Sequence, residues 1–419
     1  MTAPGEVLAH HTLVVRDGRI LAVLPHAVAL ERYTATVNVE RTSHLVLPGL
    51  VNAGVQVAVA GGSIDRPERR QDAALMSIAE LLKGGTTCFG GAGFFPEETA
   101  HAATEQGLRA LIGLPIAAAA SSWADGPGAY LTRALQFRDV YLGHPTITTA
   151  FAPHSPCTLS DEAFRRIATL ADELDTGVVV ALHESAAEVE QSLMRHGARP
   201  IARLDALGLL TPALTAMHMA HVDERDIDVA RRAGIALVLC PDADVLRGHG
   251  LPPVAAWIAT GLRIGLGSGR APCAAGLDSW STLRLTAVLS AADDDGGGTA
   301  QLAWEALARA TRGGAAALGL GAEIGTLETG KWADLCCVDL RGPAMQRGAL
   351  GAAPDARAIC AAGAPLVELA FNGGRELVSD VWVAGRHLLN EGAFTRLDWG
   401  AVRARVTAWD SRSTTGDAS

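Results

Sequence analysis

Eight short apolar segments, separated by longer amphipathic ones, recur along the chain between residues 45 and 267. This alternation is typical of successive strand and helix units, which pack as a parallel sheet covered by helices. Eight parallel strands are the number that closes such a sheet into a barrel. The chain of 419 residues is long enough for one barrel and an appended domain. The predicted strands are residues 45–52, 86–89, 109–115, 147–153, 177–183, 214–218, 235–240 and 262–267.

Both ends of the chain have a different, antiparallel pattern. Residues 11–25 form two apolar runs around Asp17-Gly18, a pair typical of a tight hairpin turn. The same pattern returns at residues 325–338 and 378–390. We therefore predict an α/β protein with a TIM-like (β/α)8 barrel and a small composite β-sandwich domain formed by both termini. The predicted bounds are 47–321 for the barrel, and 1–46 with 322–419 for the β-sandwich domain.

The composition favours a small-molecule ligand or substrate. The formal net charge is -10 and no stripe of Lys and Arg occurs, which argues against nucleic acid as a partner. No apolar run of about 18 residues and no basic leader segment occurs, which argues against membrane insertion and export. The seven cysteines are scattered without a C-x-x-C pair, as is typical of reduced thiols. We therefore expect a cytoplasmic protein, and we also expect a homodimer.

Polar side chains gather at the carboxyl ends of the predicted strands. In (β/α)8 barrels, catalytic residues lie at these strand ends. Residues two apart on a strand point to the same side, so a histidine pair at positions 54 and 56 would offer two ligands to one metal ion. The chain has Gly54 and Gln56 there instead. The other polar residues at the predicted strand ends are His154, His183, Glu184, His218, His221, Asp242, Asp244 and Arg270.

Several segments resemble the amidohydrolase superfamily, in particular its methylthioadenosine/S-adenosylhomocysteine deaminases, guanine deaminases and triazine chlorohydrolases. Residues 47–53 (Leu-Pro-Gly-Leu-Val-Asn-Ala) are similar to the family's approach to its H-x-H pair, and residues 151–156 (Phe-Ala-Pro-His-Ser-Pro) to its A-P-H-x-P segment. Residues 182–185 (Leu-His-Glu-Ser) look like H-L-H-E-T without its first histidine, and residues 330–335 match G-K-x-A-D-L. The resemblance covers nearly the whole chain. It implies a divalent metal that activates water to displace an amino or chloro group from a ring carbon.

The resemblance also places the family's five metal ligands on this chain. The H-x-H pair falls on Gly54 and Gln56, the next histidine on Ala181, the strand-six histidine on His218, and the strand-eight aspartate on Gly269. Only His218 can act as the family's ligand does. A catalytic zinc ion normally has three protein ligands. We therefore expect the family's usual zinc or iron ion to be absent and no cofactor to be bound.

The family's general acid/base glutamate falls on Glu184, which is kept. We expect Glu184 to transfer protons together with one or more neighbouring histidines, and we expect an arginine to supply positive charge. His183 and Asp242 have a competing interpretation, as a satisfied polar side chain and a loop carboxylate. The candidate residues are Glu184, His218, His154, His221 and Arg270 for catalysis, and Gln56, His183 and Asp242 for substrate binding.

Three functions remain open at this point. The first is a hydrolase that acts on C–N bonds of a small nitrogen-containing heterocyclic or nucleoside-like substrate, without the usual metal. The second is a non-catalytic relative that binds a ligand or pairs with an active paralogue, because four ligands are lost and the segment after Gly54 is short. The third is an enzyme with a displaced metal ion, held by His183, His218, His221 or Asp242.

Overall fold

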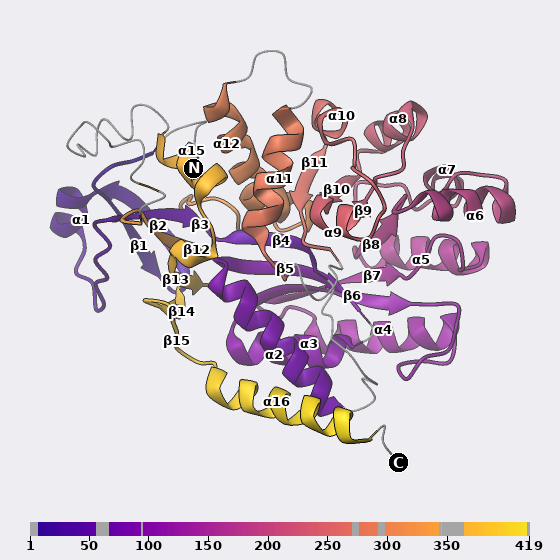
Figure 1. Ribbon diagram of the computed structural model, residues 1–419, viewed down its shortest axis with the longest axis horizontal. Helices are drawn as coiled ribbons and strands as arrows, with labels where there is room; N and C mark the ends of the chain where they lie inside the picture. The colour runs from indigo at the N-terminus through magenta and orange to yellow at the C-terminus, as the bar shows by residue number, and fades with distance from the viewer. Residues whose placement is uncertain are drawn as a thin grey trace.

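The computed structural model describes residues 7–55, 67–93, 95–269, 276–291, 298–342, 345 and 364–416. Eight parallel strands close into a barrel in the order β10-β11-β4-β5-β6-β7-β8-β9 (Figure 1). Each of the eight predicted segments overlaps one of these strands, so the predicted (β/α)8 barrel is confirmed. The strands are β4 (Leu50–Val55), β5 (Thr86–Ala92), β6 (Arg109–Ile116), β7 (Ile147–Pro153), β8 (Gly177–Leu182), β9 (Leu214–His218), β10 (Ala236–Leu239) and β11 (Arg263–Leu266).

The first predicted strand, residues 45–52, is in fact two strands that belong to different sheets. Gly49 separates β3 (His44–Pro48), which pairs with β12 (Leu335–Asp339), from β4 in the barrel. The chain changes partners here, because the Gly49 amide donates to the Asp334 carbonyl and the next amide donates to the Gly85 carbonyl, each at 3.0 Å. A Cβ atom at Gly49 would lie 2.0 Å from the Thr87 hydroxyl oxygen. Only glycine fits at this crossing point.

Helices cover the outside of the barrel (Figure 1). The predicted helix 160–174 shows why they form: the Ser160 hydroxyl caps α5 by accepting from the Ala163 amide, and Phe164, Ile167 and Leu170 bury one face. The helices around the barrel are α2 (Pro67–Lys83), α3 (Pro96–Gln106), α4 (Pro127–Tyr141), α5 (Asp161–Glu173), α6 (Ala186–His196), α7 (Pro200–Ala206), α8 (Glu224–Ala233), α9 (Pro241–Leu246), α10 (Val254–Ala259), α11 (Ser279–Ala291), α12 (Thr299–Ala308), the π-helical turn Arg309–Gly313 and α13 (Gly314–Ala317).

The two ends of the chain combine into the small β domain, as predicted. Its larger sheet has the order β15-β14-β13-β12-β3, and a separate hairpin joins β1 (His11–Arg16) to β2 (Arg19–Pro25). Asp17 and Gly18 have φ values of 52° and 78°, the left-handed pair that a two-residue hairpin turn needs. The remaining elements are α1 (His26–Arg32), α15 (Ala364–Asn372), the 3₁₀ turn Arg375–Leu377, β13 (Val378–Val383), β14 (Arg386–Asn390), β15 (Ala393–Phe394) and α16 (Trp399–Gly416).

One predicted hairpin is wrong. In the segment 325–338 only the last part is a strand, β12, and its partners are β3 and β13. The residues before β12 instead bond to the N-terminal hairpin, because the Ile20 amide donates to the Lys331 carbonyl and the Ala333 amide to the Gly18 carbonyl, each at 2.8 Å. The bounds predicted for the two domains stay a prediction.

A buried ion pair joins the barrel to the small β domain. Arg109, the first residue of β6, donates to Asp334 from Nε at 2.7 Å and from Nη2 at 3.2 Å. Asp334 precedes β12 and belongs to the G-K-x-A-D-L motif. Its side chain is 1% exposed, and that of Arg109 is 5% exposed. The motif therefore has a structural use, because it supplies the carboxylate that neutralises a buried cation.

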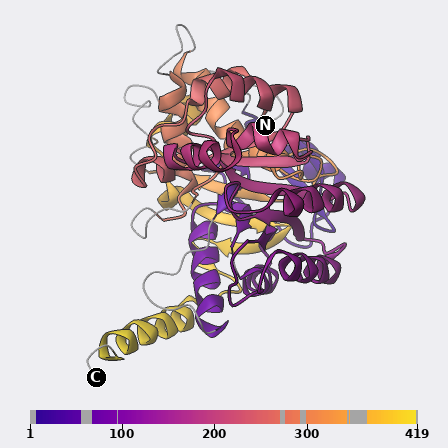
Figure 2. The ribbon, with the colours of Figure 1, turned by 90° about the vertical axis from the view of Figure 1, so that its right-hand side faces the viewer.

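The C-terminal helix α16 extends to one side of the barrel, next to α2 (Figure 2). Asp72 on α2 accepts from Arg405 Nε at 2.8 Å and from Trp409 Nε1 at 2.9 Å. The apolar core of the described residues lies in three places: between the barrel strands and their helices, inside the barrel, and around Ile20, Ala333 and Leu335 under the N-terminal hairpin. No helix in the described part of the chain is both long and apolar enough to cross a bilayer.

Candidate active site

Glu184 lies at the carboxyl end of the barrel, in the turn between β8 and α6. Its Oε1 atom is 2.6 Å from Arg247 Nη1, 3.7 Å from His249 Nδ1 and 3.9 Å from His218 Nε2. With Asp244, which binds His218, these residues form what we call the Glu184 cluster: Glu184, His218, Asp244, Arg247 and His249. The cluster joins the ends of three neighbouring strands, β8, β9 and β10.

His218 is the buried centre of the Glu184 cluster. Its Nδ1 donates to Asp244 Oδ1 at 2.7 Å, which leaves Nε2 directed toward Glu184. Burial lowers the pKa of His218, but the hydrogen bond and charge of Asp244, with the charge of Glu184, outweigh burial and raise that pKa above 6.5. His218 and the following Met219 have φ values of 72° and 55°. Such backbone is uncommon outside glycine and often occurs at functional sites.

Glu188 holds the backbone that carries Glu184. Its carboxylate accepts from the amides of His183 at 3.0 Å and Glu184 at 2.9 Å, while its own amide donates to the Ser185 hydroxyl at 3.2 Å. Burial raises the pKa of Glu188 to about 7, against the lowering effect of the two amide donors. Ser185 and Glu188 have the S-x-x-E spacing of a helix start, so this support was visible in the sequence, although we did not predict it.

His183 is not part of the cluster, although it precedes Glu184 directly. It is fully buried, its Nδ1 donates to the His221 carbonyl at 3.0 Å, and its Nε2 accepts from the Ile201 amide at 3.1 Å. Burial lowers the pKa of His183, which favours the neutral ring that this bonding pattern needs. Both ring nitrogens are used by the backbone. The geometry therefore fits the structural interpretation of His183 rather than a contact to substrate.

Three other predicted site residues follow strands at the same rim of the barrel. His221 donates from Nε2 to the His249 carbonyl, so its side chain supports the segment that carries Arg247 and His249. His154 follows β7 and is exposed, while its amide donates to the Ile116 carbonyl at 2.9 Å. Asp242 turns away, because it accepts from Thr282 Oγ1 at 2.7 Å and from the Ser281 hydroxyl. Burial raises the pKa of Asp242, opposed by these two donors.

Three members of the cluster were not among the predicted site residues: Asp244, Arg247 and His249. All follow β10 within ten residues, at the strand end where chemistry is expected. Asp244 is at a predicted strand end, but the sequence favoured its interpretation as a loop carboxylate. Arg247 and His249 have no comparable signal, since they reach Glu184 only through the turn that follows α9.

The positions of the family's metal ligands are filled differently here. A Cβ atom at Gly54 would lie 2.7 Å from Met217 Cε and 3.0 Å from Val238 Cγ1, so position 54 faces the barrel interior, as the strand pattern predicts. Gly269, with φ of 60°, would place a Cβ 2.7 Å from Ala243 Cβ. Gln56 and Arg270 lie outside the described residues. Among the described residues, no group of three or more His, Cys, Asp or Glu side chains is arranged to hold a metal ion.

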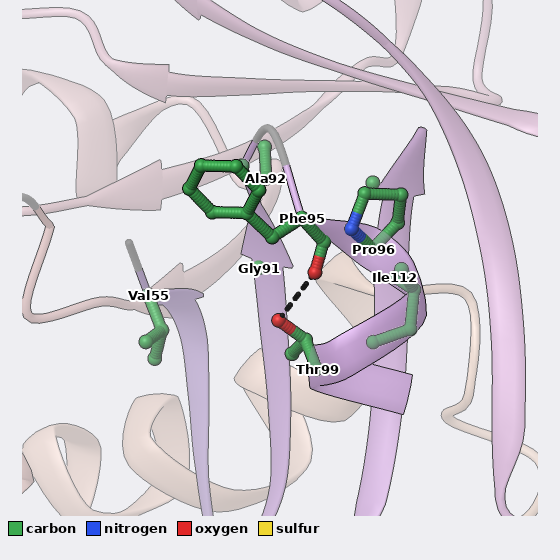
Figure 3. A pocket seen from close by; sticks show the side chains of 9 residues that line it. Val55, Gly91, Ala92, Phe95, Pro96, Thr99 and Ile112 are labelled. Atoms are coloured by element: carbon green, nitrogen blue, oxygen red, sulfur yellow. Dashed lines mark hydrogen bonds between the residues drawn. The ribbon is translucent and has the colours of Figure 1, made fainter. Parts of the chain in front are cut away.

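A small apolar pocket lies at the carboxyl ends of β4, β5 and β6 (Figure 3). Phe95 and Thr99 border it, and the Thr99 hydroxyl donates to the Phe95 carbonyl at 2.9 Å, which uses up its donor within the chain. The described residues that line this pocket are uncharged. The pocket is lined by Val55, Gly91, Ala92, Gly93, Phe95, Pro96, Thr99, Ile112 and Gly113.

Comparisons with known proteins agree with this architecture. A sequence profile of the amidohydrolase family matches residues 45–387. A 5-methylthioadenosine/S-adenosylhomocysteine deaminase from Teredinibacter turnerae is 32% identical over 95% of this chain and 92% of its own length. One from Saccharophagus degradans is also 32% identical, over 97% of this chain and 92% of its own.

Solved structures show the same likeness. A zinc-bound adenosine deaminase from Xanthomonas campestris is 35% identical, with a TM-score of 0.88 over 97% of this chain and 94% of its own. An atrazine chlorohydrolase from Arthrobacter aurescens, complexed with zinc, has a TM-score of 0.82 over 95% and 94% of the two chains. At 21% identity, the second of these shows a shared fold only.

The expectation that no metal or other cofactor is bound is contradicted by this comparison, since the adenosine deaminase at 35% identity contains bound zinc. The expectation came from transferring ligands position by position. That reasoning is too narrow, because a metal ion can also be bound by side chains from other strand ends of the same barrel mouth. The described residues do not form the family's set of donors, so the metal ligands are not assigned among them.

Proposed function

Because the chain belongs to the amidohydrolase family, we propose that it is a hydrolase that removes the exocyclic amino group from a nucleoside-like nitrogen heterocycle. The relatives named as deaminases span nearly the whole chain, which supports an enzyme of this class. The observation that carries the proposal is the position of Glu184. Its carboxylate stands at the mouth of the barrel, is ion-paired to Arg247, and faces His218 Nε2.

The proposed reaction needs one group that first accepts and then donates a proton. Water adds to the ring carbon that carries the amino group, and Glu184 takes the proton that the water loses. Glu184 then gives this proton to the amino nitrogen, the C–N bond breaks, and ammonia leaves. The ring keeps the oxygen, so the products are ammonia and an oxo heterocycle. Atoms and charge balance without an oxidant or a reductant.

The surrounding residues have distinct proposed roles. Arg247 keeps the Glu184 carboxylate in place through its ion pair, and Asp244 orients the His218 ring so that Nε2 faces the reaction. We also propose that His154 and His221 border the bound substrate, with Gln56 and Arg270 from the neighbouring strand ends.

The test is an ammonia-release assay on the purified full chain. The substrates are adenosine, 5-methylthioadenosine and S-adenosylhomocysteine, each assayed with and without added zinc so that a metal requirement does not hide the activity. We expect ammonia release from at least one substrate. Glu184→Gln should lower the turnover number by about 100-fold or more, because it removes the proton acceptor.

The matched control is Glu190→Gln, which makes the same change on an exposed side chain of α6 and should leave turnover unchanged. Wild-type turnover in Glu184→Gln would remove this residue from the mechanism. Binding of these nucleosides by equilibrium dialysis, with no ammonia release in any condition, would instead support the non-catalytic alternative.

A further inference from the structure

Three buried polar atoms of the Glu184 cluster make no hydrogen bond to any described residue: Glu184 Oε1, His249 Nδ1 and Asp244 Oδ2. The 2.6 Å contact between Glu184 Oε1 and Arg247 Nη1 is an ion pair that does not have the geometry of a hydrogen bond. Buried polar atoms in proteins are nearly always satisfied, by the chain itself or by something that it binds. Two of these atoms, Glu184 Oε1 and His249 Nδ1, lie 3.7 Å apart and therefore point to a polar group bound between them.

The distances within the cluster indicate how small that group is. Glu184 Oε1 lies 3.7 Å from His249 Nδ1 and 3.9 Å from His218 Nε2, too far for a direct hydrogen bond. Two hydrogen bonds that share one oxygen atom, each about 2.8 Å long, span such separations readily. One oxygen atom can therefore bridge the carboxylate to either imidazole ring.

His249 is held in this position by its own turn. Its amide donates to the Asp244 carbonyl at 2.8 Å, and its carbonyl accepts from His221 Nε2. Gly248 and Gly250, on either side of it, have φ values of 74° and 90°, a conformation that glycine adopts without strain. Backbone bonds and two glycines thus turn the His249 ring toward Glu184.

We propose that His249 is a catalytic residue that binds the attacking water together with Glu184 and His218. This inference rests on the proposed deaminase function. One water hydrogen is donated to Glu184 Oε1, and His249 Nδ1 and His218 Nε2 hold the oxygen in place. When the water attacks, its proton passes to Glu184, its electron pair forms the C–O bond, and the proton then leaves with the amino group as ammonia.

The first test compares the kinetics of three variants in the ammonia-release assay. His249→Ala should lower kcat by about 100-fold while KM changes less than about threefold, since the water rather than the substrate loses its contact. His249→Asn places an amide close to the position of Nδ1 and should recover about tenfold of the loss, the value of one hydrogen bond. His101→Ala, on an exposed face of α3, is the control and should match the wild type.

The second test is a crystal structure of the wild-type protein and of His249→Ala, at a resolution that shows ordered solvent. We expect a solvent oxygen within hydrogen-bond distance of Glu184 Oε1 and His249 Nδ1 in the wild type, and its loss in the variant. A kcat of His249→Ala within threefold of wild type, or no solvent oxygen there, would overturn the role of His249. A solvent oxygen in a protein that releases no ammonia would instead refute the proposed function and leave the water site standing.

Discussion

The buried ion pair between Arg109 and Asp334 allows a quantitative test of how the barrel and the small β domain depend on each other. The Asp334 carboxylate accepts two hydrogen bonds from Arg109 and a third, at 2.7 Å, from the Ala384 amide. Burial would lower the pKa of Arg109, but the charge and hydrogen bonds of Asp334 raise it. The guanidinium therefore stays charged in the folded protein.

Asp334→Ala would leave that guanidinium buried without its counter-ion and would also remove the partner of the Ala384 amide. Breaking a buried ion pair in this way costs about 3–5 kcal/mol. Asp228→Ala is the matched control, because Asp228 pairs with Arg231 at 3.0 Å on α8, where both side chains are more than half exposed. An exposed pair of this kind contributes about 0.5 kcal/mol. The predicted difference between the two variants is therefore several-fold.

The assay is urea unfolding followed by tryptophan fluorescence and circular dichroism, with the free energy of unfolding extrapolated to zero urea. A double variant, Arg109→Met with Asp334→Leu, should recover much of the lost stability, because it removes the buried charge together with its partner. Equal losses in Asp334→Ala and Asp228→Ala would refute the reasoning. Equal losses would mean that the Arg109 guanidinium reaches water when Asp334 is removed.

Two further predictions concern the barrel interior and acid stability. Gly54→Ala should lower the free energy of unfolding by about 1–3 kcal/mol, because the new methyl group meets Val238. The control Gly128→Ala adds its methyl group to open space and should not lower that free energy. Equal effects of the two variants in urea unfolding would contradict this prediction. Burial would raise the pKa of Asp380, but hydrogen bonds and charge from Arg41 lower it to about 2. Because this is below the unfolded value of 3.8, the stabilisation is present above pH 3.8 and lost as the pH falls toward 2. Asp380→Asn should abolish that loss in unfolding measured against pH; an unchanged acid limb would argue against the ion pair.

The strands of the barrel were predictable because their signal is local. A run such as 235–240 is apolar over its whole length, as a strand buried on both faces must be, and β10 lies within it, one residue shorter at each end. The same locality explains the error at residues 45–52. That segment is apolar up to Val51, but Gly49 moves the chain from one sheet to another, which depends on the Asp334 and Gly85 carbonyls from distant parts of the chain.

The sequence alone determined that Glu184 stands at the barrel mouth, because parallel strands of a closed barrel end at one rim and Glu184 follows the fifth of them. The sequence did not show that the side chains of Glu184 and His183, although adjacent, point to different places. The His183 ring turns inward, where the His221 carbonyl after β9 and the Ile201 amide of α7 occupy both of its nitrogens.

Only the tertiary structure decided what surrounds Glu184. Arg247 and His249 are more than sixty residues away along the chain, and they reach it because a turn with two left-handed glycines follows α9. The comparison of ligand positions one by one predicted that no metal is bound. The zinc-bound relative contradicts that expectation. Hydrophobic periodicity specifies strands, since each strand buries its own residues. A site depends on which loops meet, and contacts between distant segments carry no local pattern.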